Sequence, residues 1–329
     1  MTVKEIANIC GVSVATISRV FNEPEKVNPG TRKRVLEIAH KYGYTPHAVA
    51  KSLRTKKTGV YSLTVMSDVE RVFEDSYVSK FLRGAINYFS SHGLKLIIDV
   101  FTKGDVISYY KNLVFSKLID GYILMDIKDD DVRVELLNEL EVPFVCVGRN
   151  NKNNFIYVDT ENYTGGFQAG VHLKDIGCKD VLFVGGDPSL PFEKERLRGF
   201  TDGFSGSGGT IYKEYGFYEE KRVKDIVRSY LSKVDGVFCT SDVMAYASLR
   251  VFEENGMDVP IVGFDNILLS EIANLTTVEQ NIHLVGKKVA EKVHKLVLGD
   301  RVESEVIETY LIVRGTKRFL NSSKGGRGV

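Results

Sequence analysis

Arginines and carboxylates follow the ends of several predicted strands, and their types suit the binding of hydroxyl groups. Arg149 follows the run FVCVG, Ser241 and Asp242 follow GVFCT, and Asp265 follows IVGF. An arginine fork donates and a carboxylate accepts in pairs, which matches vicinal hydroxyls such as those of a sugar. Two more residues complete this predicted set, Phe73 after the first strand and Arg196 early in a helix.

Each of these residues also has a purely structural explanation, which stays open at this point. Asp242 could cap the helix that begins near Met244, Asp265 could be a turn residue before Asn266, and Arg196 could be a solvated helix charge. Asp68 and Asp159 occupy similar loops. Only the three-dimensional arrangement of these side chains can show whether they bind a ligand or stabilise the fold.

A second set of residues lies near the N-terminus, in SVATISRVFN, and its types suit contact with DNA. Helical spacing turns Val14, Ala15, Ser18 and Arg19 outward. Arg19 can span guanine O6 and N7, worth about 1–3 kcal/mol of discrimination, while Val14 and Ala15 can touch a thymine methyl group. The hydroxyls that suit phosphate oxygens are those of Ser13, Thr16 and Ser18. The alternative is an ordinary exposed helix of a small bundle.

Three short helices must position that second set. A capping box of Thr2 and Glu5 begins the first helix, which ends before Gly11, and Ser13 can cap the second. Asn28 and Pro29 open the third, and Gly43 takes its C′ position. The predicted buried residues are Val3, Ile6, Ala7, Ile17, Val20, Phe21, Val35, Leu36, Ile38 and Ala39. Two short helices separated by a glycine make a helix-turn-helix.

The charge distribution separates this basic N-terminal part from an acidic remainder. Residues 1–58 hold 11 Lys and Arg against four Asp and Glu, a net charge of +7, so the other 271 residues carry −6 within the overall +1. A basic region of this size usually meets a polyanion, because binding releases the counterions condensed on phosphate. A solvated basic surface is the alternative.

The strings TVKEIANICGVSVATISRVFN and NPGTRKRVLEIAHKYGYTPHAVAKSLRTKKTG together resemble the DNA-binding headpiece and hinge of the lac repressor (LacI/GalR) family. The resemblance implies that Val14, Ala15 and Arg19 read bases. It also implies that Leu53, with its dimer mate, wedges into the minor groove at the operator centre and kinks the duplex. The remaining hinge contacts that it implies are Ala50, Lys51 and Arg54. The hinge, about two turns long, is too short to be a stable helix alone.

From Gly59 onward, short apolar runs alternate with amphipathic segments, which predicts parallel sheets with helical crossovers. The predicted strands are 60–66, 94–100, 121–125, 144–148, 181–186, 211–218, 236–240 and 261–264. The predicted helices are 76–91, 105–116, 131–140, 162–175, 193–205, 221–232 and 243–255. Two such series make two doubly wound α/β lobes, with ligands expected beyond the carboxyl ends of the strands.

The strings VDTENYTGGFQAGVHL, ERLRGF, CTSDVMAYASL, VPIVGFDN and LTTVEQN resemble the periplasmic-binding-protein-like effector domain of the same family. The resemblance implies effector-binding roles for Arg196, Asp265 and the Ser241/Asp242 pair, with Arg149 and Phe73 as neighbours. Two departures are a shorter segment after Pro260 and Asn274 where a proline is habitual. The resemblance also implies interleaved lobes, with the chain crossing near 158, 280 and 314.

We therefore expect four parts in the chain. They are a helix-turn-helix headpiece at 1–46, a hinge helix and linker at 47–58, an N-terminal effector-domain lobe at 59–157 plus 280–313, and a C-terminal lobe at 158–279 plus 314–329. The predicted function is a sequence-specific transcriptional regulator, a repressor, whose affinity for a palindromic double-stranded operator is controlled by a small-molecule effector, a carbohydrate. A corepressor-dependent regulator that binds a nucleobase is the alternative, and a solute-binding protein is a remote one.

Several absences complete the prediction. No GxxxxGK[ST], HExxH or GxSxG string occurs, so we expect no enzyme. The four cysteines have no CxxC spacing, so we expect no metal site, no disulfide framework and no cofactor. MTVKEIANIC lacks the apolar run of a signal peptide, and we expect a cytoplasmic protein without a membrane span. The tail NSSKGGRGV has no leucine heptads, so we expect a homodimer without a tetramerising helix.

Overall fold

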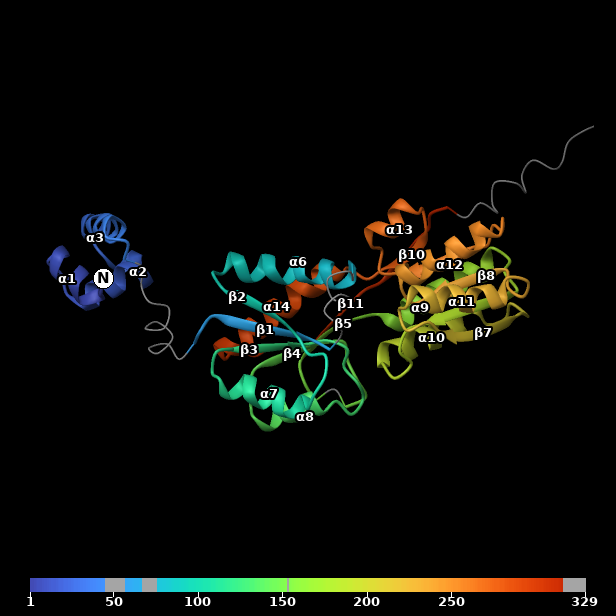
Figure 1. Ribbon diagram of the computed structural model, residues 1–329, viewed down its shortest axis with the longest axis horizontal. Coiled ribbons are helices and arrows are strands. Elements are labelled where there is room, and N and C mark those ends of the chain that lie inside the picture. The colour runs from blue at the N-terminus through green and yellow to red at the C-terminus, as the bar shows by residue number, and fades with distance from the viewer. Residues whose placement is uncertain (45–56, 67–75, 153, 316–329) are drawn as a thin grey trace, which may run out of the picture. The chain divides into compact units, whose positions relative to one another are not determined.

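The computed structural model describes residues 1–44, 57–66, 76–152 and 154–315. The chain divides into two compact units, Met1–Gly59 and Val60–Val329 (Figure 1). The described part of the first unit holds helices without strands, and the second unit contains two β-sheets covered by helices. The expected fold class, a helix-turn-helix headpiece followed by a two-lobed α/β domain, is confirmed.

The described residues of the first unit form three α-helices and a short 3-10 turn. They are α1 (Val3–Cys10), α2 (Val14–Asn22), the turn η1 (Pro24–Lys26) and α3 (Pro29–Lys41). The capping box forms as predicted, since the Glu5 backbone N–H donates to Thr2 Oγ1 and the Thr2 backbone N–H donates to Glu5 Oε2. Gly11 ends α1 in the left-handed conformation, with φ of 63°, which glycine adopts without steric cost.

The core of the first unit is built from the predicted faces, with one exception. Ile6, Ile17 and Val35 are buried and meet in one cluster, while Leu36 is 38% exposed, so its predicted burial is wrong. Leu36 lies one residue beyond Val35, about 100° further round the helix. The short helices α1 and α2 cover only a narrow face of α3, which is not wide enough to bury both Val35 and Leu36.

The second unit contains two six-stranded sheets. The first has the order β11-β5-β4-β3-β1-β2 and is parallel throughout. Its strands are β1 (Val60–Val65), β2 (Lys95–Val100), β3 (Gly121–Leu124), β4 (Phe144–Val147), β5 (Tyr157–Thr160) and β11 (Glu305–Ile307). The second has the order β12-β10-β9-β8-β6-β7, with β12 alone antiparallel to its neighbour. Its strands are β6 (Asp180–Gly185), β7 (Thr210–Tyr215), β8 (Gly236–Cys239), β9 (Ile261–Phe264), β10 (Thr276–Glu279) and β12 (Tyr310–Ile312).

Helices cover both faces of each sheet (Figure 1). The first sheet packs against α6 (Ser76–Ser91) and α14 (Ile282–Leu298) on one face and against α7 (Val106–Phe115) and α8 (Val132–Glu139) on the other. The second sheet packs against α9 (Asn162–Asp175) and α10 (Pro191–Phe204) on one face and α11 (Glu220–Tyr230) and α12 (Asp242–Glu254) on the other. A short α13 (Leu268–Ile272) follows β9.

The chain passes between the two sheets three times. The first passage follows β5, which pairs within the first sheet. The second lies between β10 and α14. The third lies between β11 and β12, because residues 310–312 pair with β10.

Glycines let paired helices approach until their backbones touch. On the second lobe, a Cβ at Gly166 would lie 2.2 Å from the Arg196 carbonyl oxygen, and one at Gly199 would lie 2.0 Å from that of Tyr163. The first lobe uses the same arrangement, since a Cβ at Gly84 would meet the His283 oxygen at 2.0 Å. Any larger residue would push these helices apart. The position of α10 is therefore fixed closely by α9.

No helix in the described ranges is long and apolar enough to span a bilayer.

Candidate functional site

Arg196 lies at the centre of a buried polar cluster on the second lobe. Its side chain, only 6% exposed, projects from α10. Nε donates to Asn162 Oδ1 at 2.9 Å and Nη1 to the Thr240 carbonyl oxygen at 2.8 Å, while the guanidinium stacks 3.8 Å from the centre of the Phe264 ring. The guanidinium is therefore held in one orientation, and the interpretation as a solvated helix charge is wrong.

Asp159 and Arg149 form an ion pair beside this cluster. Arg149 Nε lies 3.1 Å from Asp159 Oδ2, while Asp159 Oδ1 accepts from the Thr160 backbone N–H and from Asn162 Nδ2. Burial raises the pKa of Asp159 to about 6, because it outweighs these hydrogen bonds and the charges of Arg149 and Arg196. A carboxylate with a raised pKa among arginines is typical of a functional site.

Gln280, at the second crossing between the lobes, connects Asp265 to this cluster. Its Nε2 donates to Asp265 Oδ1 at 2.5 Å, and its Oε1 accepts from Thr160 Oγ1 at 3.0 Å and from Arg196 Nη2 at 3.5 Å. Asp265 has a φ of 115°, a conformation that side-chain-bearing residues rarely adopt and that concentrates at functional sites. The structure thus brings Arg149, Arg196 and Asp265 of the predicted set into one network.

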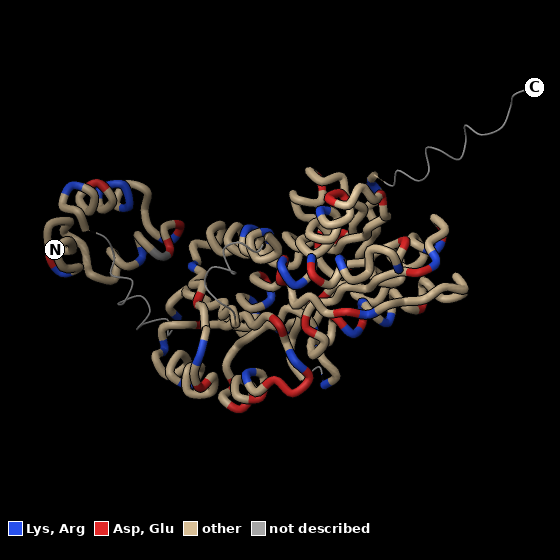
Figure 2. The backbone as a smooth tube through the Cα atoms, turned by 45° about the vertical axis from the view of Figure 1, so that its right-hand side comes forward, with Lys and Arg blue, Asp and Glu red and all other residues tan. Residues whose placement is uncertain are grey.

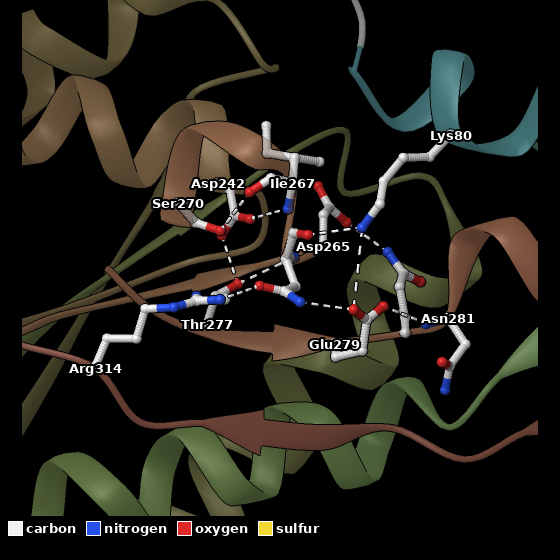
Figure 3. A network of polar contacts seen from close by, with 11 residues as sticks. Lys80, Asp242, Asp265, Ile267, Ser270, Thr277, Glu279, Asn281 and Arg314 are labelled. Atoms are coloured by element: carbon white, nitrogen blue, oxygen red, sulfur yellow. Dashed lines mark hydrogen bonds and ion pairs between the residues drawn. The ribbon is translucent and has the colours of Figure 1, made fainter. Parts of the chain in front are cut away.

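Ser241 and Asp242 have structural partners. Ser241 is the N-cap of α12, and its Oγ accepts from the Met244 backbone N–H. Asp242 is fully buried and accepts from Thr277 Oγ1 at 2.5 Å and from the Ile267 backbone N–H at 2.9 Å (Figure 3). Burial raises the pKa of Asp242 to about 6. This carboxylate holds the loop that follows Asp265.

Asn266 extends the same network toward the first lobe. Lys80, from α6, donates to the Asn266 carbonyl oxygen at 2.7 Å and lies 4.0 Å from Glu279 (Figure 3). From the opposite direction, Arg314 Nη2 donates to Asn266 Oδ1 at 2.6 Å. The loop with Asp265 and Asn266 is thereby fixed by groups from both lobes.

The first lobe also contributes a tyrosine to this region. Burial raises the pKa of the Tyr77 phenol, and the charges of Asp265, Arg196 and Asp126 act on it. Tyr77 lies in the first turn of α6, and Asp126 lies just after β3. Both residues therefore belong to the first lobe. The polar cluster therefore involves residues of both lobes.

Sequence reasoning missed three members of this cluster: Asn162, Glu193 and Gln280. Asn162 and Gln280 carry side-chain amides and lie just after predicted or observed strand ends. Their position after a strand was the one sequence signal that could have identified them as members of the cluster. Glu193 lies at the predicted start of a helix, where a carboxylate is expected for its effect on the helix dipole.

The first unit presents α2 with the predicted outward face. Ser13 caps the helix, since its Oγ accepts from the Thr16 backbone N–H at 3.1 Å and lies 2.9 Å from Thr16 Oγ1. Ile17 and Val20 are buried, so the opposite side of the helix faces away from the core. Ser13 and Thr16 thus have a structural role besides any contact with phosphate.

The side chains on that opposite side are accessible. Val14 is 41% exposed, Ala15 and Arg19 are exposed, and Ser18 is half-buried. The same unit carries further basic residues along α3, namely Arg32, Lys33, Arg34 and Lys41, and Lys and Arg positions of the tube are drawn blue in Figure 2. An exposed helix with an arginine fork in a basic unit has the size and chemistry to enter a major groove.

The predicted hinge contacts and one predicted effector contact lie outside the described residues. They are Ala50, Lys51, Leu53, Arg54 and Phe73.

The cysteines and possible metal ligands form no reactive site in the described ranges. Cys10, Cys146, Cys178 and Cys239 are buried and form no disulfide with one another, and burial raises the pKa of Cys239 to about 12. No group of three or more His, Cys, Asp or Glu residues in those ranges could hold a metal ion.

Comparison with known proteins places both parts of the chain. Residues 2–47 match the model described as "Bacterial regulatory proteins, lacI family", and residues 171–317 match "Periplasmic binding protein-like domain". The transcriptional regulator CelR of Thermobifida fusca is 29% identical over 331 residues, which cover 95% of this chain and 97% of that protein. The transcriptional repressor PurR of Photobacterium profundum is 28% identical, covering 97% and 99%.

Solved structures agree with this assignment. A CelR–cellobiose complex is 27% identical, has a TM-score of 0.72 and covers 95% of this chain and 99% of its own. A lac repressor dimer bound to operator has a TM-score of 0.83 and covers 96% of this chain and 98% of its own, at 20% identity, which supports the fold alone.

Proposed function

This chain belongs to the lacI family of bacterial regulatory proteins, and from that premise we propose that it is a transcriptional repressor whose operator affinity is set by a neutral sugar. The sugar binds to the polar cluster around Arg196. Two copies act together on a palindromic operator, because a two-fold pair of recognition helices matches two half-sites. Since its target is DNA, it acts in the cytoplasm and not as an enzyme.

The exposed face of α2 supports the DNA-binding half of this proposal. Arg19 reads a guanine edge, and Val14 and Ala15 make apolar base contacts. The proposed phosphate contacts are Ser13, Thr16 and Ser18, and the proposed hinge contacts are Ala50, Lys51, Leu53 and Arg54.

One observation carries the effector half: Arg196 is buried, and its fork is fixed by Asn162 and Thr240 beside two carboxylates, those of Asp159 and Asp265. Donors and acceptors held in alternation suit a molecule whose neighbouring hydroxyls both donate and accept. The similarity to a regulator solved with cellobiose favours a sugar further. In this proposal Arg149, Arg196, Asp265 and Phe73 contact the effector, whereas Ser241 and Asp242 hold the surrounding loops.

Effector and operator are coupled in this proposal through the arrangement of the two lobes. Binding between lobes changes their relative position, and by thermodynamic reciprocity operator must change effector affinity by the same factor. The usual scale of such coupling is about 1–3 kcal/mol.

The test is a thermal-shift screen of the full-length protein against cellobiose, maltose, glucose, galactose, adenine and guanine. A ligand at 100 times its Kd adds about 2.7 kcal/mol of stability. We expect a shift with at least one sugar, lost in Arg196→Ala and kept in Arg198→Ala, an exposed arginine on the same helix. A shift with a purine alone would favour the nucleobase alternative and contradict the sugar.

Operator binding completes the test. We expect the protein to select a palindrome from random duplexes in moderate salt, with an affinity that changes when the bound sugar is added. No preference for any sequence, with or without ligand, would contradict the regulatory function.

A further inference from the structure

Glu193 is a buried carboxylate on the same helix face as Arg196. The two residues are three apart on α10, so their side chains are neighbours. Glu193 is only 2% exposed and Arg196 only 6%. A buried carboxylate is costly unless its oxygens are hydrogen-bonded, so its partners indicate its role.

One carboxylate oxygen is fully engaged. Glu193 Oε1 accepts from the Tyr218 hydroxyl at 2.5 Å and from Thr240 Oγ1 at 2.9 Å. Thr240 also accepts the Arg196 Nη1 hydrogen bond through its carbonyl oxygen, at 2.8 Å. A single residue at the end of β8 thus fixes both the carboxylate and the guanidinium.

Tyr218 is itself fixed by a glycine. A Cβ at Gly186 would lie 2.0 Å from Tyr218 Cζ, so the tyrosine ring lies directly against the Gly186 backbone. The Gly186 N–H in turn donates to Thr240 Oγ1 at 3.1 Å. Glu193 therefore belongs to a rigid group of side chains that is already formed without a ligand.

The other carboxylate oxygen, Oε2, has no hydrogen-bond partner among the described residues. An unsatisfied buried polar group costs about 1–3 kcal/mol, and more when it is charged. A purely structural glutamate would use both oxygens.

We infer that Glu193 determines the specificity of the effector site: its Oε2 accepts a hydrogen bond from one hydroxyl of the sugar, while Arg196 donates to the adjacent oxygen. This inference rests on the proposed sugar-binding function. It restricts the ligand further, because a carboxylate accepts but does not donate. The sugar must carry a free hydroxyl at that position, and a phosphate or carboxylate there is repelled.

The experiment is calorimetric titration of full-length protein with whichever of cellobiose, maltose, glucose and galactose it binds, and with deoxy and deoxyfluoro analogues of that sugar. Fluorine can accept but not donate, so it removes only the proposed hydrogen bond. We expect one analogue position to weaken binding to the wild type at least tenfold. The Glu193→Gln variant should bind the parent sugar at least tenfold more weakly than the wild type does. It should also bind the parent sugar and that analogue with equal affinity.

Two further variants complete the design. Glu195→Gln makes the same change two residues along α10, at a partly exposed carboxylate that pairs with Arg198, and should bind like the wild type. Tyr218→Phe leaves the carboxylate but removes the hydroxyl that fixes it, and should lose about threefold at the same sugar position. Tyr218→Phe decides the question if Glu193→Gln does not fold.

The outcomes separate this inference from the function on which it rests. Unchanged sugar affinity in Glu193→Gln, or an equal loss for the parent and every analogue, overturns the role of Glu193 and leaves the sugar effector intact. If the wild type binds no sugar, the proposed function and this inference are both overturned.

Discussion

At the scale of single residues, the cluster contains carboxylates that folding disfavours in their charged form. Asp159 is 7% exposed, and burial raises its pKa from 3.8 to about 6. The difference of about two units corresponds to about 3 kcal/mol lost on folding at neutral pH. Proteins tolerate such a loss of stability at sites whose side chains are needed to bind a ligand.

Asp159→Asn tests this cost through its pH dependence. Below pH 3.8 both folded and unfolded wild-type chains are protonated at this position, so there is no penalty. As pH rises toward 6 the unfolded chain ionises first, and wild-type stability falls. We expect the free energy of unfolding of the variant, relative to the wild type, to rise by about 2 kcal/mol from pH 4 to pH 7 in urea titrations. A difference independent of pH would contradict the raised pKa.

Arg19→Ala tests base reading at the exposed face of α2. We expect preference at one base pair per half-site to relax by about 1–3 kcal/mol, because a bidentate contact to guanine is lost. Binding-site selection on wild type and variant measures this. Lys33→Ala, an exposed change on α3, should leave base preference intact. A uniform loss across all sequences would make Arg19 a phosphate contact instead.

The sequence predicted a site residue only where a side chain able to bind hydroxyl groups also lay after a predicted strand or early in a predicted helix. Arg196 and Asp265 lie close together because α10, which carries Arg196, follows β6 and Asp265 directly follows β9, and both strands belong to one sheet. Gln280 was not predicted, because its role depends on the chain crossing between lobes there. Asp242 illustrates the opposite case: a carboxylate in a predicted loop is held by Thr277 and the Ile267 N–H, a pairing between segments distant in sequence.

At the scale of elements, the predicted periods located seven helices and eight strands of the second unit closely, but neither α13, which has only five residues, nor α14. The N-cap residue of α14, Asn281, is in the left-handed conformation and makes no capping hydrogen bond with its side chain, so the usual start signal is absent. The strands β5, β10, β11 and β12 are not among those that the apolar runs predicted, because β5 and β10 mix polar with apolar residues and β11 and β12 have only three residues each.

The glycine contacts between α9 and α10 position the residues proposed to bind the effector. Gly166 and Gly170 face α10, while Gly199 and Gly203 face α9, and each would place a Cβ within 2.4 Å of a backbone oxygen of the partner helix. Glycine disfavours an isolated helix, so these four glycines lower the helix propensity of α9 and α10. They also allow the two helices to pack closely against each other. The effector residues on α10 depend on that close approach.

Gly199→Ala should therefore displace α10. A Cβ there would lie 2.0 Å from the Tyr163 carbonyl oxygen, and overpacking of this kind costs about 1–3 kcal/mol. We expect a lower unfolding midpoint and at least tenfold weaker binding of the sugar identified by thermal shift. Glu195→Ala, at a partly exposed position on the same helix, is the control and should change neither. Wild-type affinity in Gly199→Ala would show that the site does not depend on this contact.

At the scale of the second unit, ion pairs join the two lobes reciprocally. Lys128 of the first lobe lies 4.0 Å from Asp187 of the second, and Lys194 of the second lies 2.8 Å from Asp129 of the first. The loop that carries Lys128 and Asp129 is firmly held, since Asn150 Nδ2 donates to both of their carbonyl oxygens, at 2.9 and 3.2 Å. Each lobe thus presents one cation and one anion to the other.

Charge reversal tests whether these pairs favour the arrangement that binds effector. The side chains are partly exposed, so each pair contributes only about 0.2–1 kcal/mol. Asp129→Lys replaces one attraction by repulsion with Lys194, and we expect sugar affinity to fall about two- to fivefold at low salt. The difference should shrink at high salt, because screening acts on exposed charges. The double variant Asp129→Lys with Lys194→Asp should recover wild-type affinity. Recovery is the decisive measurement, since a loss that persists in the double variant would mean that Asp129 acts on its own loop and not across the lobes.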